Sequence, residues 1–237
     1  MSPGETWIHS WRRRKALESD HASVAGSTIV RSIVRTALVA SLVAVGTLTI
    51  ALRRSGTWQR LGAWGADPAL AAGTLPGDEL VVDPFAVDTR TLEIDAPPAA
   101  IWPWFVQMGD DRGGEYSYSL FGFPHRKGAD RIVPEWQDLA VGDRINQWVV
   151  RELEPERALV LHNDVGGSWS WVFVLQPTGD SGRTRLIERI RSRPALPRHI
   201  GTAVMRVLGL GMLLMVHKQM LTIRPRAETA RADLSVD

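Results

Sequence analysis

Residues 89–120, TRTLEIDAPPAAIWPWFVQMGDDRGGEYSYSL, decide how this chain folds. At their start, Leu92 and Ile94 alternate with acidic residues, which is typical of a strand with one buried face. Ala96-Pro97-Pro98 then ends the strand and presets the backbone for the first turn of a helix. The stretch therefore predicts a half-buried strand that leads directly into a helix.

The predicted helix has one apolar stripe, because four large apolar residues recur at helical spacing: Ile101, Trp104, Phe105 and Met108. Pro103 cannot donate a backbone hydrogen bond, so we expect a kink or a tightened turn there. Gly109 ends the helix, and Gly113-Gly114 allow a sharp turn before a tyrosine-rich segment.

A strand that ends in Ile-Asp-Ala-Pro-Pro and enters a helix containing Ile-Trp resembles the start of the SRPBCC superfamily (START/polyketide-cyclase-like, helix-grip). Later segments strengthen the resemblance, which extends from about residue 64 to 230: ADRIVPEWQDLAVGD, VRELEPERALVL, SWVFVLQP and GRTRLIERIRSRP. The resemblance also extends to a membrane-anchored bacterial branch of the superfamily. It implies an α+β helix-grip fold, a curved antiparallel sheet wrapped around a long C-terminal helix. It does not define a reaction, because this scaffold carries binders as well as cyclases.

The remaining strands and the last helix follow the same plan. Short connections rich in Gly, Pro and Asp predict hairpins, and hence an antiparallel meander. Four further strands are expected at residues 143–150, 157–163, 169–175 and 184–191, followed by a helix over about 197–222. The expected domain organisation is a disordered basic tail (1–28), a transmembrane helix (29–54), a linker (55–88), the helix-grip domain (89–224) and a polar tail (225–237).

The predicted anchor centres on Thr36–Leu52, a run of 17 residues without a charged side chain. At 1.5 Å per residue it reaches about 26 Å, which nearly matches a bilayer core if the flanking arginines extend to the headgroups. A signal peptide is an alternative, but Arg53-Arg54 occupy the position of a cleavage site. A soluble or interfacial helix is the other alternative.

Charge divides the chain. Residues 1–60 contain nine Lys or Arg and three Asp or Glu, whereas the remainder contains nineteen and twenty-three. The folded part is thus mildly acidic, which disfavours a nucleic-acid surface. Six basic residues precede the anchor and three follow it closely, so the expected location is the cell membrane, single-pass, with an exported domain favoured. We expect a monomer. The absence of cysteine excludes disulfides and thiolate metal sites.

The final predicted helix is apolar nearly all round. Arg206 and the pair His217-Lys218 bracket an uncharged run of ten residues, which spans about 15 Å and is too short for a second membrane crossing. Such a helix needs two apolar faces. One would face the sheet, and the other a cavity or the first helix.

A curved sheet closed by one long helix can leave a cavity for one apolar ligand. Trp169, Trp171 and Phe173 alternate with smaller residues and should share one sheet face. The aromatic and methionine candidates for lining a cavity are Trp104, Tyr116, Tyr118, Phe121, Trp148, Trp169, Trp171 and Met212. The alternative is that these side chains simply fill a solid core.

Two titratable residues are candidates for acid/base chemistry. Glu188 lies between Leu186 and Ile190 and should face inward with them, where a carboxyl group needs a partner or a raised pKa. By the same alternation His162 should also face inward, and the two form the best acid/base combination available. A lone histidine is, however, more often a satisfied core residue. The six histidines lack metal-ligand spacing, so we expect neither a metal nor a cofactor.

The function expected from these observations is a membrane-anchored domain that binds a hydrophobic small molecule, such as a lipid, an isoprenoid or a polyketide-like compound. Two alternatives remain open. One is a polyketide cyclase or hydrolase-like enzyme, which needs two convergent titratable groups. The other is a non-catalytic scaffold with a filled core.

Overall fold

The computed structural model describes residues 63–118, 128–179 and 182–234, with side chains as far as Ala230. The chain divides into two units, Met1–Ser55 and Gly56–Asp237, and all described residues belong to the second. The predicted basic tail, the predicted anchor and Phe121 lie outside the described residues.

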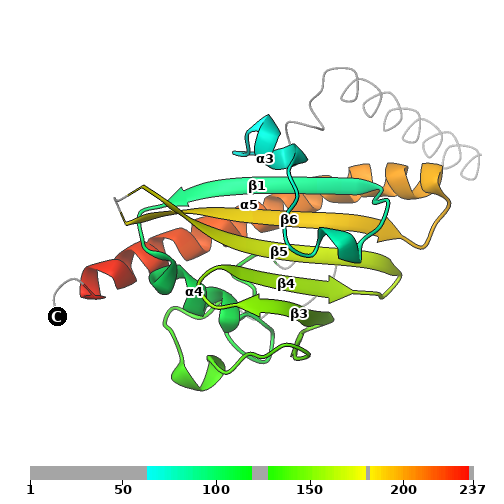
Figure 1. Cartoon of the computed structure of the whole chain (residues 1–237). Helices are drawn as coiled ribbons and strands as arrows, with labels where there is room; N and C mark the ends of the chain where they lie inside the picture. Colours follow the sequence, from blue (N-terminus) through cyan, green and yellow to red (C-terminus); the bar gives the residue numbers. More distant parts are fainter. Residues whose placement is uncertain (1–62, 119–127, 180–181, 235–237) are drawn as a thin grey trace, which may run out of the picture. The chain divides into compact units, whose positions relative to one another are not determined.

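A six-stranded antiparallel sheet forms the centre of the domain (Figure 1). Its spatial order is β1-β6-β5-β4-β3-β2, so the predicted meander is confirmed and the first strand pairs with the last. The strands are β1 (Ala86–Ile94), β2 (Arg144–Ile145), β3 (Trp148–Glu154), β4 (Ala158–Asn163), β5 (Gly167–Thr178) and β6 (Arg183–Pro194).

Two helices cover one face of this sheet, which we call the inner face. The first, α4 (Pro98–Val106), contacts β5 through Phe105 and Phe173, whose ring centroids lie 4.7 Å apart. The second, α5 (Arg198–Leu234), passes behind β1 and β6 in Figure 1 and buries Met220 and Ile223 against the sheet and α4. The α+β class and the long C-terminal helix are therefore confirmed.

The opposite, outer face is covered by residues 63–85, which carry the short helices α3 (Pro68–Ala72) and η1 (Asp78–Leu80); a further short helix, η2 (Pro134–Trp136), precedes β2. Gly77 sits so close to the sheet that a Cβ there would lie 2.4 Å from Val160, and its φ of +75° also favours glycine. The described part of residues 55–88, which the sequence predicts as a linker and approach segment, is packed onto the sheet.

Arg189 of β6 holds this covering segment in place. Its side chain is 1% exposed and donates to Asp78 Oδ2 at 2.7 Å, an ion pair. It also donates to four other oxygens, namely Thr89 Oγ1 and the carbonyls of Leu70, Ala71 and Gly73. A buried guanidinium is tolerated here because nearly all of its donors are satisfied.

The last helix extends further than the sequence predicts. Pro225 lies inside α5, which continues to Leu234. Ala227 is fully buried in the core, and the Arg226 guanidinium lies 5.5 Å from the Tyr116 ring centroid. These contacts compensate for the hydrogen bond that Pro225 cannot donate. The stretch predicted as a polar tail, residues 225–237, is thus helical as far as Leu234, and it contacts the core through Ala227.

Candidate functional site

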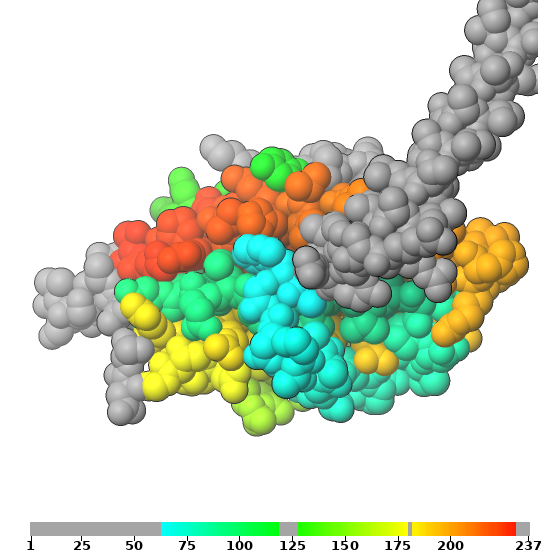
Figure 2. Space-filling view, turned by 90° about the horizontal axis from the view of Figure 1, so that it is seen from above, coloured from blue at the N-terminus to red at the C-terminus, as the bar shows by residue number. Residues whose placement is uncertain are grey.

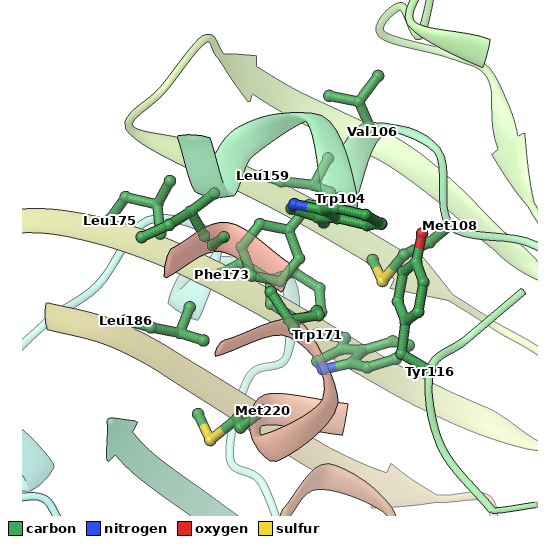
Figure 3. Packing of buried hydrophobic residues seen from close by; sticks show 14 of the residues in the cluster. Trp104, Val106, Met108, Tyr116, Leu159, Trp171, Phe173, Leu175, Leu186 and Met220 are labelled. Carbon is green, nitrogen blue, oxygen red and sulfur yellow. The ribbon is translucent and has the colours of Figure 1, made fainter. Parts of the chain in front are cut away.

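The inner face carries a cluster of aromatic rings. As alternation predicts, Trp171 and Phe173 of β5 face the helices, and their ring centroids lie 4.9 Å apart. Trp148 of β3 lies 5.5 Å from Trp171. Figure 3 shows Trp171, Phe173 and Trp104 gathered between α4 and Met220 of α5. These rings provide a broad apolar wall.

Glu188 lies within this wall and is fully buried. Because Glu188 opposes Phe173 in the β5–β6 register, its side chain points to the inner face, as predicted. The indole nitrogen of Trp171 donates to Glu188 Oε1 at 2.5 Å, and Oε2 has no hydrogen-bond partner within the described part of the chain. Burial raises the pKa of Glu188 to about 8, although Trp171 and the positive charge of Arg90 both lower it. The group is therefore mostly protonated at neutral pH.

Arg90 of β1 stands directly opposite Glu188 in the β1–β6 register. Its side chain is 1% exposed, and its Nη2 lies 3.5 Å from Oδ1 of Asp88, two residues away on the same face. The Nε and Nη1 atoms of Arg90 have no hydrogen-bond partner among the described residues. Burial raises the pKa of Asp88, and Arg90 lowers it by a smaller amount. Arg90 is thus a buried cation with little compensation.

Ser192 of β6 completes the group, because its hydroxyl is buried and likewise unpaired within the described residues. We call Asp88, Arg90, Trp171, Glu188 and Ser192 the Arg90–Glu188 site. Several polar atoms without partners in one buried place cost free energy, unless something else supplies hydrogen bonds there. The arrangement can hold the polar group of a small molecule, and Glu188 can exchange a proton with it.

Helix α5 extends over this site. At one end a Cβ on Gly201 would lie 2.5 Å from the Phe85 ring, and at the other end the Asp95 amide donates to Glu228. The helix therefore runs in the same direction as β1. Arg90 lies about 17 Å along β1 from Phe85, a distance that α5 covers in about 11 residues. The same count back from Glu228 reaches residue 217, so residues 212–217 of α5 lie level with Arg90. Met212, a predicted lining residue that is partly buried against the core, is at one end of this stretch.

Two predicted lining residues of the same cluster, Trp104 and Tyr116, form an aromatic pair. Their centroids lie 5.9 Å apart with the rings edge to face, and the Arg226 guanidinium lies over both. The Tyr116 hydroxyl accepts a hydrogen bond of 2.7 Å from Gln107 Nε2. Burial raises the pKa of Tyr116 to about 12, so this residue stays protonated. The pair is buried in the core beneath α5.

Two other predicted residues lie at the margins of the site. Trp169 is on the inner face but half-buried, and its indole donates to the Val165 carbonyl in the β4–β5 turn. Tyr118 is 51% exposed, with Lys218 of α5 over its ring. The structure therefore places Trp148, Trp171 and Glu188 together, and leaves Tyr118 in contact with solvent.

His162 lies on the wrong face of the sheet for the predicted acid/base pair. It opposes Ser170 in the β4–β5 register, whereas Glu188 opposes Phe173 on the other face. Its Nε2 lies 3.1 Å from Ser168 Oγ, beneath the covering segment of the outer face. The sheet separates His162 from Glu188, so the expectation that the two face the same cavity is wrong.

Sequence reasoning did not find Asp88, Arg90 or Ser192. A signal was present for Arg90, because it has the same parity as Leu92 and Ile94, which were assigned to the buried face. An arginine on that face is a buried charge, and such residues are rare unless they are paired or functional.

A groove with a volume of about 370 Å³ lies between β1 and residues 64–70. Its lining includes Trp64, Thr91 and the ion pair of Glu93 with Arg185, in which Nε and Oε1 lie 2.7 Å apart. Its charged groups satisfy each other, so the groove is a weaker candidate than the Arg90–Glu188 site. Among the described residues no cluster of His, Asp or Glu could hold a metal ion.

The observed arrangement of six antiparallel strands and a long C-terminal helix across the inner face is the helix-grip fold expected from the resemblance to the SRPBCC superfamily. No protein-family model and no curated protein matches this chain.

Similar solved structures include an aromatase/cyclase. Protein MLL2253 from Mesorhizobium loti is 18% identical, with 60% of this chain and 97% of that chain covered and a TM-score of 0.34. Protein Ms6760 from Mycobacterium smegmatis is 12% identical, with 63% and 92% covered and a TM-score of 0.35. The Zhui aromatase/cyclase from Streptomyces sp. R1128 is 15% identical, with 62% and 93% covered and a TM-score of 0.34. These matches concern the fold and not the site.

Proposed function

We propose that this domain binds an amphipathic small molecule between the inner face of the sheet and α5. The apolar part of the ligand contacts Trp148, Trp171 and Met212, and its polar group reaches the Arg90–Glu188 site. The observation that carries the proposal is the buried guanidinium of Arg90, two of whose nitrogens have no hydrogen-bond partner in the described structure.

The electrostatics of the site favour a ligand with an oxygen-rich or anionic group. A buried cation is costly unless it is paired and hydrogen-bonded. Asp88 compensates only weakly, because its nearest contact with Arg90 is 3.5 Å and burial raises its pKa. Glu188 is mostly neutral at pH 7 and can donate a proton to a ligand oxygen. The site therefore offers hydrogen-bond donors and one positive charge.

The packing of α5 supports the same location. From residue 198 to 215 only Gly201 and Met205 are buried, whereas Val216, Met220 and Ile223 of the next stretch are buried in the core. The loosely packed half of the helix is the half that lies over Asp88 and Arg90. A ligand at this point would add contacts where the helix makes few of its own.

The test is to compare ligand retention in two arginine variants of the full chain purified in detergent. Native mass spectrometry detects a co-purifying compound, and binding of anilinonaphthalene sulfonate, an apolar dye with one anionic group, measures affinity. We expect Arg90→Leu to lose the compound and to weaken dye binding about tenfold or more, the effect of one lost charge-assisted hydrogen bond. Arg185→Gln, at a half-exposed ion pair, should behave as wild type. Equal retention in both variants would refute the proposal.

A second candidate is an enzyme of the cyclase type, favoured by the protonated Glu188 beside Trp171. A buried carboxylic acid whose pKa is about 8 can act as a general acid at neutral pH. If the compound that binds wild type is chemically altered, while Glu188→Gln retains it unaltered, the domain is an enzyme. If both proteins retain the same compound, it is a binder.

We also propose that residues 29–54 anchor the chain in the cell membrane. The support is the uncharged run Thr36–Leu52 and the arginines that follow it. The full chain should stay in the membrane pellet after alkaline carbonate extraction. Recovery in the soluble fraction, or a mature N-terminus beyond Leu52, would show that there is no anchor.

A further inference from the structure

We propose that the exposed face of α5 docks on the surface of an anionic lipid bilayer, with the helix axis parallel to the membrane. Five large apolar side chains of α5 are between 40% and 57% exposed, and we call them the α5 stripe: Ile200, Val207, Leu210, Leu214 and Leu221. Part of the surface of α5, in orange and red, is visible in Figure 2.

The spacing places these side chains on one face. Ile200, Val207, Leu214 and Leu221 follow each other at intervals of seven residues, and such a series drifts by only about 20° per step around an α-helix. The α5 stripe extends for about 32 Å. The opposite face is committed to the core through Met205, Val216, Met220 and Ile223. The helix thus has two apolar faces, and the sheet covers only one of them.

The charges of α5 identify the partner. From Arg198 to Ala227 the helix contains no Asp or Glu, but it contains seven basic or histidine residues: Arg198, His199, Arg206, His217, Lys218, Arg224 and Arg226. Arg198 and Arg224 are already paired, with Asp83 and with Glu228 of the same helix, each at 2.9 Å. At 100° per residue, Arg206 falls along one edge of the α5 stripe, and Lys218 falls within it. An apolar stripe bordered by cations fits a bilayer with anionic headgroups.

The same charges argue against a second copy of the chain as the partner. A symmetric dimer through the α5 stripe would bring the same surface of both copies together. The cations at its edge would then face each other, which is unfavourable. Anionic lipids supply the opposite charge.

A position on the membrane surface fits better than a membrane crossing. Judged by length and composition alone, one helix of the described residues could cross a membrane, and it is Arg198–Ala230, with a mean hydropathy of 1.7 in its most apolar window. Arg206 and Lys218, however, interrupt the apolar run, and the packed face of the helix cannot leave the sheet without exposing the core.

The natural absence of cysteine allows a direct test on the full chain. A single cysteine is introduced by Leu214→Cys in the α5 stripe or, as a control, by Val165→Cys, a position that is 70% exposed at the β4–β5 turn. Each is labelled with a fluorophore, and the protein is reconstituted into vesicles of phosphatidylcholine alone or mixed equally with phosphatidylglycerol. Iodide quenches labels that are in water, and brominated lipid quenches labels that touch the bilayer.

With phosphatidylglycerol, we expect iodide to quench the label at 214 about threefold less than the label at 165, and brominated lipid to quench it strongly. Adding Arg206→Glu and Lys218→Glu should restore iodide quenching, while circular dichroism shows an unchanged fold. Iodide access at 214 in both vesicle types would overturn the proposal. So would shielding at 214 without quenching by brominated lipid, because protein and not lipid would then cover the α5 stripe. Shielding that survives the charge reversal would overturn the role of anionic lipid.

Discussion

Arg90 and Glu188 stand directly opposite each other in the β1–β6 pair, and both side chains are about 1% exposed. Opposed residues of an antiparallel pair share a face, so a guanidinium and a carboxyl group lie next to each other on the inner face without a hydrogen bond between them in the described structure. Burial raises the pKa of Glu188 to about 8 despite the positive charge of Arg90. At neutral pH the site therefore combines a cation with a mostly neutral acid.

The free energy of unfolding should depend on pH because Glu188 ionises at a different pH in the folded and the unfolded protein. Glu188 has an ordinary pKa of 4.5, which burial raises to about 8 in the folded protein. Below about pH 4.5 Glu188 is protonated in both the folded and the unfolded protein. Between pH 4.5 and about pH 8 it is protonated only in the folded protein. The stabilising contribution is thus full at low pH and is lost as the pH rises through about 8, with a slope of at most about 1.4 kcal/mol per pH unit. Urea unfolding from about pH 5 to pH 9 measures this loss.

Glu188→Gln is the control for that profile. Its amide cannot ionise, yet its oxygen can still accept the hydrogen bond from Trp171. The free energy of unfolding of the variant should vary much less over the same pH range. A variant as steeply pH-dependent as wild type would assign the effect to another group.

Trp171→Phe tests the hydrogen bond itself. The indole N–H stabilises the ionised form of Glu188 and so lowers its pKa. Removing this donor should raise the pKa further and shift the loss of stability to higher pH, as measured by the same urea series. Trp148→Phe is the matched control, because Trp148 contacts the Trp171 ring, while the hydrogen bond to the carboxyl group comes from Trp171. If both variants shift the profile equally, the cause is packing and not the hydrogen bond.

Arg189 should be far more important for stability than exposed arginines of the same strand. Replacing Arg189 with Met leaves the carbonyls of Leu70, Ala71 and Gly73 without this donor, and it removes the closer of the two arginines that pair with Asp78. We therefore expect a loss of about 3–5 kcal/mol. Arg185→Gln breaks an ion pair that is half exposed and should cost less than about 1 kcal/mol. Urea unfolding compares the two. Similar costs would mean that residues 63–85 are not held by Arg189.

The alternation of large and small residues predicts correctly which side chains of β5 and β6 point to the inner face. For β4 the same rule predicts the wrong face. In β5, large aromatic residues alternate with smaller ones, and the register confirms that Trp171 and Phe173 share a face. In β4, all six residues are buried, because the segment around Gly77 covers the outer face as well. A strand that is buried on both faces has no alternation from which to orient His162. Its orientation depends on long-range pairing with β5.

The remaining differences also have their origin in tertiary contacts. The covering segment contains turns and short helices that look like a linker. Its packing depends on residues far away in the sequence, such as Arg189 and Val160. Arg90 was overlooked because charge normally indicates exposure. Local rules thus predicted the strands and the C-terminal helix, but they could not show which polar residues are buried by distant parts of the chain.

The continuation of α5 beyond Pro225 leads to the last prediction. Ala227 is fully buried against the core, whereas Thr229, two residues later, is exposed. Ala227→Asp would bury an unpaired carboxyl group and should destabilise the domain by about 3 kcal/mol or more. Thr229→Asp carries the same new charge on the solvent side of the same turn and should change the free energy of unfolding by about 0.5 kcal/mol or less. Because both variants alter the same predicted polar tail, a frayed tail would tolerate them equally. Urea unfolding in which only Ala227→Asp is destabilised would show that α5 forms part of the core beyond Pro225.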